Sequence, residues 1–407
     1  MPELIYWLWL SQIQSVGASK CVKYIEHFRD IRKLYDADKH ALYEVPKHLP
    51  NEVSALMNKN LDTAKAIYEK CISGKINIIP LNSKHYPERL ASIYDPPTVL
   101  FVKGNLPDID NECIAAIVGT RKAGQYGLTL SERLGFEVAE CGGIVTSGLA
   151  DGIDGAAVKG ALRAEGTPIG VLGTGIDIIF PNTNERLFRE TEARGALISE
   201  YPPGFPASRH TFPARNRIIS GISLSVIIIE APFKSGSLIT AAHAREQGRE
   251  VLVIPGNVDM PSFEGSNELL RDGAELITQG WDAVGRHAWR FPSGKLGRKK
   301  NVRQIINAAP GESAIRGKVP VPAVKRAEEP AKPVPLKVPE KARARISAFP
   351  VFEGDEEHVY SCLEGTMSAD VITARSELTP NQVMVALTML ELKGLVKNLG
   401  GMNYEKL

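Results

Sequence analysis

The chain has 407 residues, of which 43% are hydrophobic, and 49 Lys and Arg against 47 Asp and Glu give it a net charge of only +2. This length suffices for two or three domains with a core that needs no metal or disulfide support. The five cysteines show no CxxC or paired spacing, which argues against zinc and disulfides and indicates a reducing, cytoplasmic location (Cys21, Cys71, Cys113, Cys141 and Cys362).

Residues 1–75 are predicted to form a small helical domain. The apolar segment 4–10 is too short to span a bilayer, so we expect a core helix there and no membrane partner. Residues 14–28 place Gly17 before apolar positions at helical spacing, which resembles one helix-hairpin-helix unit. Residues 44–57 resemble a degenerate second unit. Such units hold nucleic-acid backbone in some proteins and are purely structural in others, and both interpretations stay open.

Residues 76–291 alternate short apolar runs with helical stretches such as 126–141 and 237–247. Because the runs are continuously apolar, the strands are expected to be covered on both faces of a mostly parallel, doubly wound, Rossmann-like α/β sheet. Ligands of such sheets bind at the carboxyl ends of the strands. The predicted strands are 76–80, 98–104, 114–119, 142–148, 168–173, 195–200, 225–230 and 250–256.

Small residues follow several of these strands, and they precede a helix or a polar segment. Such turns present bare backbone N–H groups, which suit phosphate or another anion, and an arginine adds a planar charged fork. Each turn alone is also explained by helix capping or by a surface ion pair. The prediction of an anion site therefore depends on several such turns lying at the same edge of the sheet. The candidate residues are Gly119, Thr120, Arg121, Ser147, Gly148, Ser235, Gly236 and Ser237.

Residues 208–221 are the densest functional candidate, because basic side chains there surround an aromatic ring. Proteins hold single-stranded nucleic acid in this way: the charges follow the phosphates and the ring stacks on a base. An asparagine in the segment is expected to cap a turn or to hydrogen-bond a base. The candidate residues are Arg209, Phe212, Arg215, Asn216 and Arg217.

Several enzyme signatures are missing from the sequence. It has neither the GxxxxGK[ST] phosphate loop nor a GxGxxG turn with an acidic residue about 20 positions further on, and no nuclease-type carboxylate cluster. Asp151, Asp154 and Asp177 follow glycine-rich turns, where aspartate more often serves the turn than a metal. We therefore expect no catalytic residue, no metal site and no cofactor.

The last part of the chain is predicted to consist of a linker followed by a small folded domain. Residues 292–350 are predicted to be an extended linker, since prolines lie among 14 basic and 4 acidic residues between positions 294 and 349. Residues 351–407 are predicted to form a winged helix, with helices at 356–363 and 369–376, a third helix from a Thr379 capping box to Leu392, and a hairpin over 395–404. This domain is acidic, which favours a protein-contact or structural role over the binding of duplex DNA, because DNA phosphates are negatively charged.

Seven motifs follow one another along the chain: GTR at 119–121, SGLADGID at 147–154, VLGTGID at 171–177, LISEYPPG at 197–204, FPARNRIISG at 212–221, EAPFKSGSLITA at 230–241 and EQGREVLVIPG at 246–256. Taken together and in order, they resemble the DNA processing protein A (DprA/Smf) family. An ordered series of this length is specific, although each motif alone is not.

The resemblance implies a sterile-alpha-motif-like helical domain, an extended Rossmann-like domain and a winged helix. It also implies binding of single-stranded DNA, dimerisation through the Rossmann-like domain, and loading of the RecA recombinase during natural transformation. Arg121, Arg209 and Phe212 match the family's functional positions, and the family often has lysine at the second of these. Asp151 and Val158 depart from the family, which usually has a basic residue and a histidine there.

Two other functions stay open at this point. A nucleotide-acting enzyme resembling the lysine-decarboxylase-like phosphoribohydrolases would have a related fold, but the expected PGGxGT turn with its glutamate is replaced by KSGSLITA. A transcription regulator that reads duplex DNA through the winged helix is weakened by that domain's acidity.

Overall fold

The computed structural model describes residues 2–13, 15–298, 355–363, 365–376, 378–392, 395–400 and 403–406. The chain divides into two compact units, Met1–Arg316 and Gly317–Leu407. Most of the predicted linker, residues 299–350, lies outside the described residues. The predicted boundaries at 75/76 and 291/292 stay predictions. No helix in the described ranges is long and apolar enough to cross a membrane.

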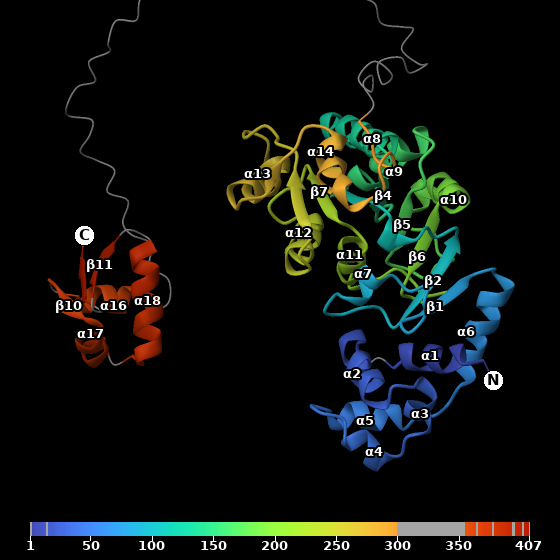
Figure 1. Cartoon of the computed structure of the whole chain (residues 1–407), viewed down its shortest axis with the longest axis horizontal. Coiled ribbons are helices and arrows are strands. Elements are labelled where there is room, and N and C mark those ends of the chain that lie inside the picture. Colours follow the sequence, from blue (N-terminus) through green and yellow to red (C-terminus); the bar gives the residue numbers. More distant parts are fainter. Residues whose placement is uncertain are drawn as a thin grey trace, which may run out of the picture. The chain divides into compact units, whose positions relative to one another are not determined.

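A nine-stranded sheet forms the centre of the first unit (Figure 1). Its order is β1-β2-β6-β5-β4-β3-β7-β8-β9, and all neighbours are parallel except β1 with β2 and β2 with β6. The predicted mostly parallel Rossmann-like fold is confirmed. The strands are β1 Asn77–Pro80, β2 Val99–Gly104, β3 Ile114–Gly119, β4 Ile144–Ser147, β5 Ile169–Leu172, β6 Ala196–Ser199, β7 Ser225–Ile229, β8 Glu250–Val253 and β9 Glu275–Leu276.

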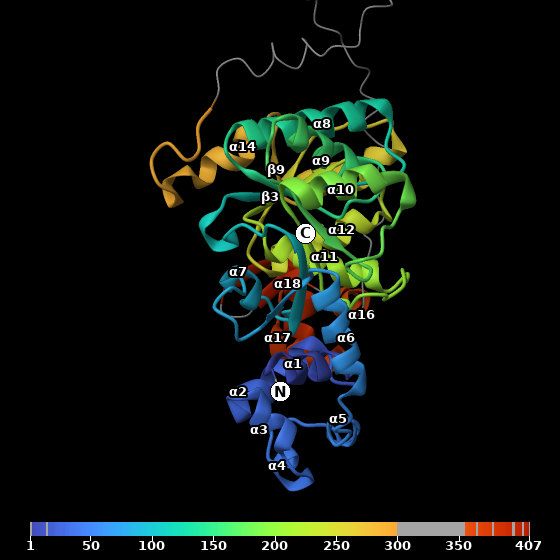
Figure 2. The same cartoon turned by 90° about the vertical axis from the view of Figure 1, so that its right-hand side faces the viewer.

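The chain winds away from β3 in both directions, first through β4, β5 and β6 and then back through β7, β8 and β9. Helices cover both faces of the sheet, as Figures 1 and 2 show. One face packs against α8 (Gln125–Glu140), α9 (Ile153–Arg163), α10 (Glu185–Arg194) and α14 (Gly280–Val284). The other packs against α7 (Glu88–Ala91), α11 (Thr211–Gly221), α12 (Gly236–Glu246) and α13 (Glu264–Arg271).

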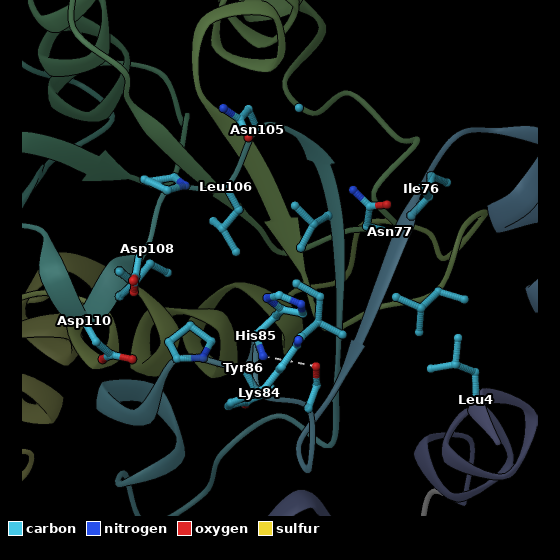
Figure 3. A pocket seen from close by; sticks show the side chains of 18 of the residues that line it. Leu4, Ile76, Asn77, Lys84, His85, Tyr86, Asn105, Leu106, Asp108 and Asp110 are labelled. Carbon is cyan, nitrogen blue, oxygen red and sulfur yellow. Dashed lines mark hydrogen bonds between the residues drawn. The ribbon is translucent and has the colours of Figure 1, made fainter.

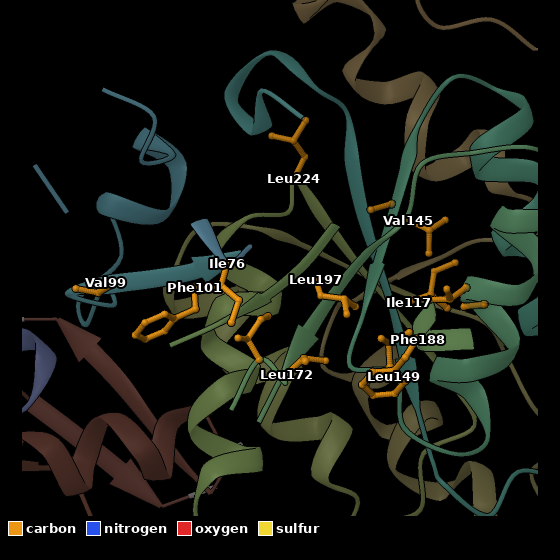
Figure 4. Close-up of a cluster of buried hydrophobic side chains, with 14 of the residues drawn as sticks. Ile76, Val99, Phe101, Ile117, Val145, Leu149, Leu172, Phe188, Leu197 and Leu224 are labelled. Carbon is orange, nitrogen blue, oxygen red and sulfur yellow. The ribbon is translucent and has the colours of Figure 1, made fainter. Parts of the chain in front are cut away.

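Each central strand contributes alternate residues to the two cores. Ile117 belongs to one core and Val118 to the other, and both are at most 3% exposed. This burial on both faces explains the unbroken apolar runs in the sequence. Figure 4 shows part of the first core, in which Val145, Leu149 and Phe188 lie beside Ile117.

The N-terminal helices extend that first core beyond the β1–β2 end of the sheet (Figure 1). Trp7 and Leu8 of α1 are at most 1% exposed and join the same apolar cluster as Phe101 of β2. The predicted first helix is therefore confirmed. The helices are α1 Leu4–Ser11, α2 Ala18–Phe28, α3 Ile31–Asp36, α4 Lys39–Tyr43, α5 Pro50–Leu56 and α6 Asp62–Ser73.

A buried carboxylate joins two of these helices. Glu52 of α5 is fully buried and accepts from Lys23 Nζ at 2.8 Å and from Tyr24 Oη at 3.0 Å on α2, and it pairs with Lys20 at 2.9 Å. Desolvation by burial would raise the pKa of Glu52, but the hydrogen bonds from Lys23, Lys20, Tyr24 and the Leu49 N–H lower it to about 2.

The second unit has the predicted winged-helix elements. Three helices, α16 (Glu356–Cys362), α17 (Ala369–Ser376) and α18 (Pro380–Leu392), pack on an antiparallel sheet of order β10-β12-β11. The strands are β10 Met367–Ser368, β11 Val396–Gly400 and β12 Asn403–Lys406. The predicted capping box is also present, since Gln382 N donates to Thr379 Oγ1 at 3.4 Å and Gln382 Oε1 accepts from Thr379 N at 3.1 Å.

The Glu52 contacts make stability sensitive to acid. Because the pKa in the folded state is below the unfolded value of about 4.5, the stabilisation is complete above that value and is lost as the pH falls toward 2. Glu52→Gln should lower the free energy of unfolding at neutral pH by about 2 kcal/mol, because a buried neutral amide replaces the charged acceptor of the hydrogen bonds from Lys23 and Tyr24. Urea unfolding between pH 2 and 7 measures both effects. Glu69→Gln, at an exposed position on α6, is the control; equal loss in the two variants would contradict the assignment.

Candidate functional site

A pocket of about 600 Å³ lies at the carboxyl ends of β3 and β7, where the winding of the sheet reverses. In doubly wound sheets this reversal leaves a crevice, because the connections from the two strands leave on opposite sides. Ten of the thirteen predicted site residues line it: Gly119, Thr120, Arg121, Arg209, Phe212, Arg215, Asn216, Ser235, Gly236 and Ser237. Of the remaining three, Gly148 lines a small adjoining cavity, and Ser147 and Arg217 line neither space.

The turn after β3 is held by Glu230, which follows β7. Thr120 N donates to the Glu230 carbonyl at 2.9 Å, and Gly124 N donates to the Glu230 carboxylate oxygens at 3.0 and 3.1 Å. Glu230 has a φ of 45°, and a Cβ on Gly127 would lie 2.0 Å from its carboxylate. Glu230 is therefore a positioning residue that we did not predict from the sequence.

Arg121 and two aromatic rings form one wall of the pocket. The Arg121 guanidinium carbon lies 5.0 Å from the Phe212 ring centroid, and the Phe180 ring lies 5.4 Å from Phe212 at an interplanar angle of 33°. Phe180 is 42% exposed, so its ring is accessible to a ligand. Phe180 carries no signal of its role in the sequence, because it follows the end of β5 by eight residues and lies outside the glycine- and serine-rich turns.

The start of α12 also lines the pocket. Ser235 is the N-cap of this helix, and its Oγ accepts from Ser237 N at 3.3 Å. The predicted capping at this turn is confirmed. A Cβ on Gly236 would meet no atom within 4 Å, so the backbone there borders open space. Lys234, exposed just before the cap, also lines the pocket and was not predicted.

Arg215 lies beneath the pocket and is only 4% exposed. Its Nη1 donates to the Gly148 carbonyl at 3.0 Å and also to the Val171 carbonyl. A Cβ on Gly148 would lie 2.3 Å from this guanidinium, so glycine is required for the arginine to fit. Burial lowers the pKa of Arg215 to about 10, while the nearby carboxylate of Asp154 opposes that shift. Burial likewise raises the pKa of Asp154, against the charge of Arg215.

Two predicted site residues are committed to internal contacts. Arg217 is 8% exposed and binds Glu200 at 2.7 Å and Asp95 at 3.2 Å, so its charge is already neutralised within the protein. Ser147 is fully buried, and its Oγ donates to the Ile117 carbonyl at 2.7 Å. The structure therefore does not support direct ligand contact by Arg217 or Ser147.

Asn216 has a structural partner at the pocket, since its Nδ2 donates to the Gly236 carbonyl at 3.2 Å and so ties α11 to the start of α12. Of the two departures from the family pattern, Val158 is fully buried in α9. Asp151 is exposed, accepts from Thr183 Oγ1 at 2.8 Å and lines a small adjoining cavity of about 70 Å³ rather than the main pocket.

The accessible charge of the pocket is positive. Arg121, Arg209 and Lys234 are exposed, and none of them has an ion-pair partner in the part of the chain that the structure describes. Within the same described ranges, no three His, Cys, Asp or Glu side chains gather in a way that could hold a metal ion. The pocket therefore offers cations, backbone N–H groups and aromatic rings to a ligand.

A second pocket, of about 640 Å³, lies against β1 and β2 (Figure 3). Ile76 and Leu106 line it together with Lys84 and His85, but two carboxylates, Asp108 and Asp110, stand on its rim. It lacks the exposed arginines of the first pocket and is less suited to an anion.

The chain also resembles known proteins. A family model described as DNA recombination-mediator protein A matches residues 77–287, which include the whole pocket, and a model of the DprA winged helix domain matches residues 332–402. Protein Smf of Synechocystis sp. is 31% identical over 418 aligned residues, which cover 99% of each chain. The chain belongs to the DNA recombination-mediator protein A family. The predicted resemblance to DprA/Smf is confirmed.

Two further relatives support membership of the DprA/Smf family. DNA processing protein DprA of Bacillus subtilis is 43% identical over 208 residues, which cover 51% of this chain and 69% of the relative. The X-ray structure of DprA from Streptococcus pneumoniae superposes with a TM-score of 0.61 and 32% identity over 70% of this chain and 97% of that one.

The role of Glu230 leads to a testable expectation. Glu230→Ala removes the acceptors of Gly124 N, and we expect a loss of about 2 kcal/mol in the free energy of unfolding, as for other hydrogen bonds to charged groups. Hydrogen exchange should accelerate most at the Gly124 amide. Glu26→Ala, at an exposed position on α2, is the control. Unchanged exchange at Gly124 in the Glu230 variant would contradict the positioning role.

Proposed function

We propose that this protein binds single-stranded DNA in the pocket at β3 and β7 and loads RecA recombinase onto that strand during natural transformation. It acts as a cytoplasmic homodimer joined through the Rossmann-like domain, without catalysis, metal or cofactor. The observation that carries the proposal is the combination of three exposed cations, which have no ion-pair partner among the described residues, with two neighbouring phenylalanine rings around one pocket.

A single strand matches this combination of groups. Its phosphates pair with arginine and lysine, and its unpaired bases stack on aromatic rings, whereas the bases of a duplex are already stacked on each other. The Arg121 guanidinium carbon lies 5.0 Å from the Phe212 ring centroid. One nucleotide can therefore place its base on the ring and its phosphate against the guanidinium. Recognition of this kind depends little on base sequence.

The pocket residues fall into two roles under this proposal. Arg121, Arg209 and Lys234 bind phosphates, while Phe212 and Phe180 stack on bases. The N–H group at Gly236 adds partial positive charge at the start of α12, whereas the Ser237 N–H already donates to Ser235 Oγ. Arg215 contributes through its fixed field, because its Nη1 donates to two backbone carbonyls and its Nε donates to Asn216 Oδ1.

The enzyme alternative receives less support. Hydrolysis of a nucleotide needs a carboxylate that is free to act at the reacting atom. Glu230 uses both of its oxygens on Gly124 N, and Asp154, which lines the pocket, is 6% exposed and accepts from Gly148 N at 3.0 Å. A regulator that acts through the winged helix is also less favoured, since Gln382 at the start of α18 binds Asp355 at 3.0 Å instead of facing a ligand.

Replacing the exposed arginines tests strand binding. We expect Arg121→Ala and Arg209→Ala each to weaken binding of oligo-dT by about 10- to 100-fold, since a hydrogen bond to a charged group contributes about 1.5–3 kcal/mol. Each substitution should also reduce the slope of log affinity against log salt concentration by about 0.7, because one phosphate contact is lost. Fluorescence anisotropy over a range of salt concentrations measures both quantities.

Arg186→Ala is the matched control, because Arg186 is 91% exposed but lies on α10, away from the pocket lining. Gly236→Ala tests the same pocket without removing charge: its methyl group meets no protein atom, so the fold is preserved while close approach of a strand is blocked. Gly297→Ala, at another open glycine, controls for that change. Unaltered binding by both arginine variants and by Gly236→Ala would reject this pocket as the strand site.

RecA loading is a separate part of the proposal with its own measurement. The protein should help RecA to displace a single-strand-binding protein from long DNA, observed as faster onset of DNA-dependent ATP hydrolysis by RecA. Arg121→Ala should lose this stimulation at protein concentrations that leave DNA unsaturated. Strong DNA binding without any stimulation of RecA would reject the loading role while leaving strand binding intact.

A further inference from the structure

Four large apolar side chains stand exposed beside the pocket, and we call them the outer patch. Tyr126 is 57% exposed, Phe233 62%, Val258 83% and Met260 50%. None of the four lines the pocket itself. Two of them are aromatic, and exposed apolar side chains that gather on one face of a protein mark an interaction site, whereas single ones need no explanation.

The outer patch comes from three adjacent strands of the sheet. Tyr126 lies in the first turn of α8 after β3, Phe233 lies in the loop after β7, and Val258 and Met260 lie in the loop after β8. Parallel strands end at the same edge, so these loops meet at the edge that carries the pocket.

Internal contacts hold these loops together. The Tyr126 ring lies 5.9 Å from the ring of Phe263, which packs so closely on Gly256 that a Cβ there would lie 1.9 Å away. Ser266 N donates to the Ala231 carbonyl at 3.0 Å, which fixes the start of α13 against the loop that carries Phe233. The outer patch is therefore built on anchored loops.

The outer patch continues directly from the pocket. Phe233 stands between Pro232 and Lys234, and both of these line the pocket. Lys122 and Lys234 are exposed beside it and have no ion-pair partner among the described residues, while the exposed acids on the same loops are Asp259 and Glu264. In the sequence, the two lysines are close to Tyr126 and Phe233, whereas the two acids are next to Met260 and Phe263.

We propose that the outer patch is a second stacking subsite for the same single strand, in which bases leaving the pocket stack on Phe233 and Tyr126. The inference rests on the proposed strand binding. Stacking accepts any base, and lysines on the turns that carry the two rings suit the intervening phosphates. A strand that crosses from Phe180 and Phe212 to Phe233 and Tyr126 follows one edge of the sheet from β5 to β7.

A series of oligo-dT strands of increasing length tests this subsite. For the unaltered protein, affinity should rise with length in two stages, as the pocket and then the outer patch are filled. In Tyr126→Ser, Phe233→Ser and the double variant, the shortest strand that binds should keep its affinity. Long strands should bind about 5- to 100-fold more weakly, the loss expected from one or two missing stacking contacts.

Strands with abasic positions separate stacking from other causes. A long strand that is abasic only beyond the length that fills the pocket should bind the unaltered protein as weakly as the long dT strand binds the double variant, and combining the two changes should add no further loss. Phe233→Trp and Tyr126→Phe should restore the second stage. Trp289→Ser, at an 83% exposed ring on η4 (Gly285–Arg290), should change nothing, because η4 lies at the opposite edge, where His287 contacts Glu250.

Two results would overturn the subsite: equal losses for short and long strands, or no loss at any length in the double variant. The second result would indicate that a protein partner, and not the strand, covers the outer patch. If the unaltered protein binds no strand of any length, the proposed function itself fails, and the subsite fails with it. Thermal unfolding of each variant, compared with the unaltered protein, shows whether a loss reflects misfolding.

Discussion

The parallel pairing of β3 with β7 is the contact on which the pocket depends. These strands are neighbours in the sheet although about a hundred residues separate them, and they meet so closely at their carboxyl ends that a Cβ on Gly119 would lie 1.9 Å from the Ile229 carbonyl. Glu230 then extends the contact beyond the sheet by binding the turn after β3. Gly119 is therefore required for the close packing of β3 against β7, and the pocket lies beside this contact.

The four arginines around this edge show how burial divides similar side chains into different roles. Arg121 and Arg209 keep their charge at the surface, where a ligand can displace water from it. Arg215 is enclosed by carbonyl groups, and Arg217 is neutralised by Glu200 and Asp95. Arg121 and Arg209 break no ion pair of the described residues when they turn to a phosphate, whereas Arg217 would have to break a buried ion pair, which is costly.

Much of this arrangement could be predicted from the sequence, because the signals are local. Unbroken apolar runs of strand length placed eight of the nine strands, and the turns after them together with the basic segment 208–221 supplied ten of the eighteen residues that line the pocket. The ninth strand, Glu275–Leu276, is two exposed residues long and leaves no apolar run to recognise. Arg217 could not be separated from Arg209 because its partners Asp95 and Glu200 are distant in sequence, and Glu230 was missed because its partner, Gly124 N, is a backbone group over a hundred residues away.

Gly127 and Glu230 have a consequence for how this fold can vary. The carboxylate of Glu230 occupies the space that any side chain at position 127 would need, and the amide of Gly124 needs that carboxylate. A change at either position alone leaves a clash or an unsatisfied amide, so we expect relatives to keep both residues or to replace them together. Positions 127 and 230 are therefore expected to covary. This links the helix that follows β3 to the end of β7, the two strands whose carboxyl ends form the pocket.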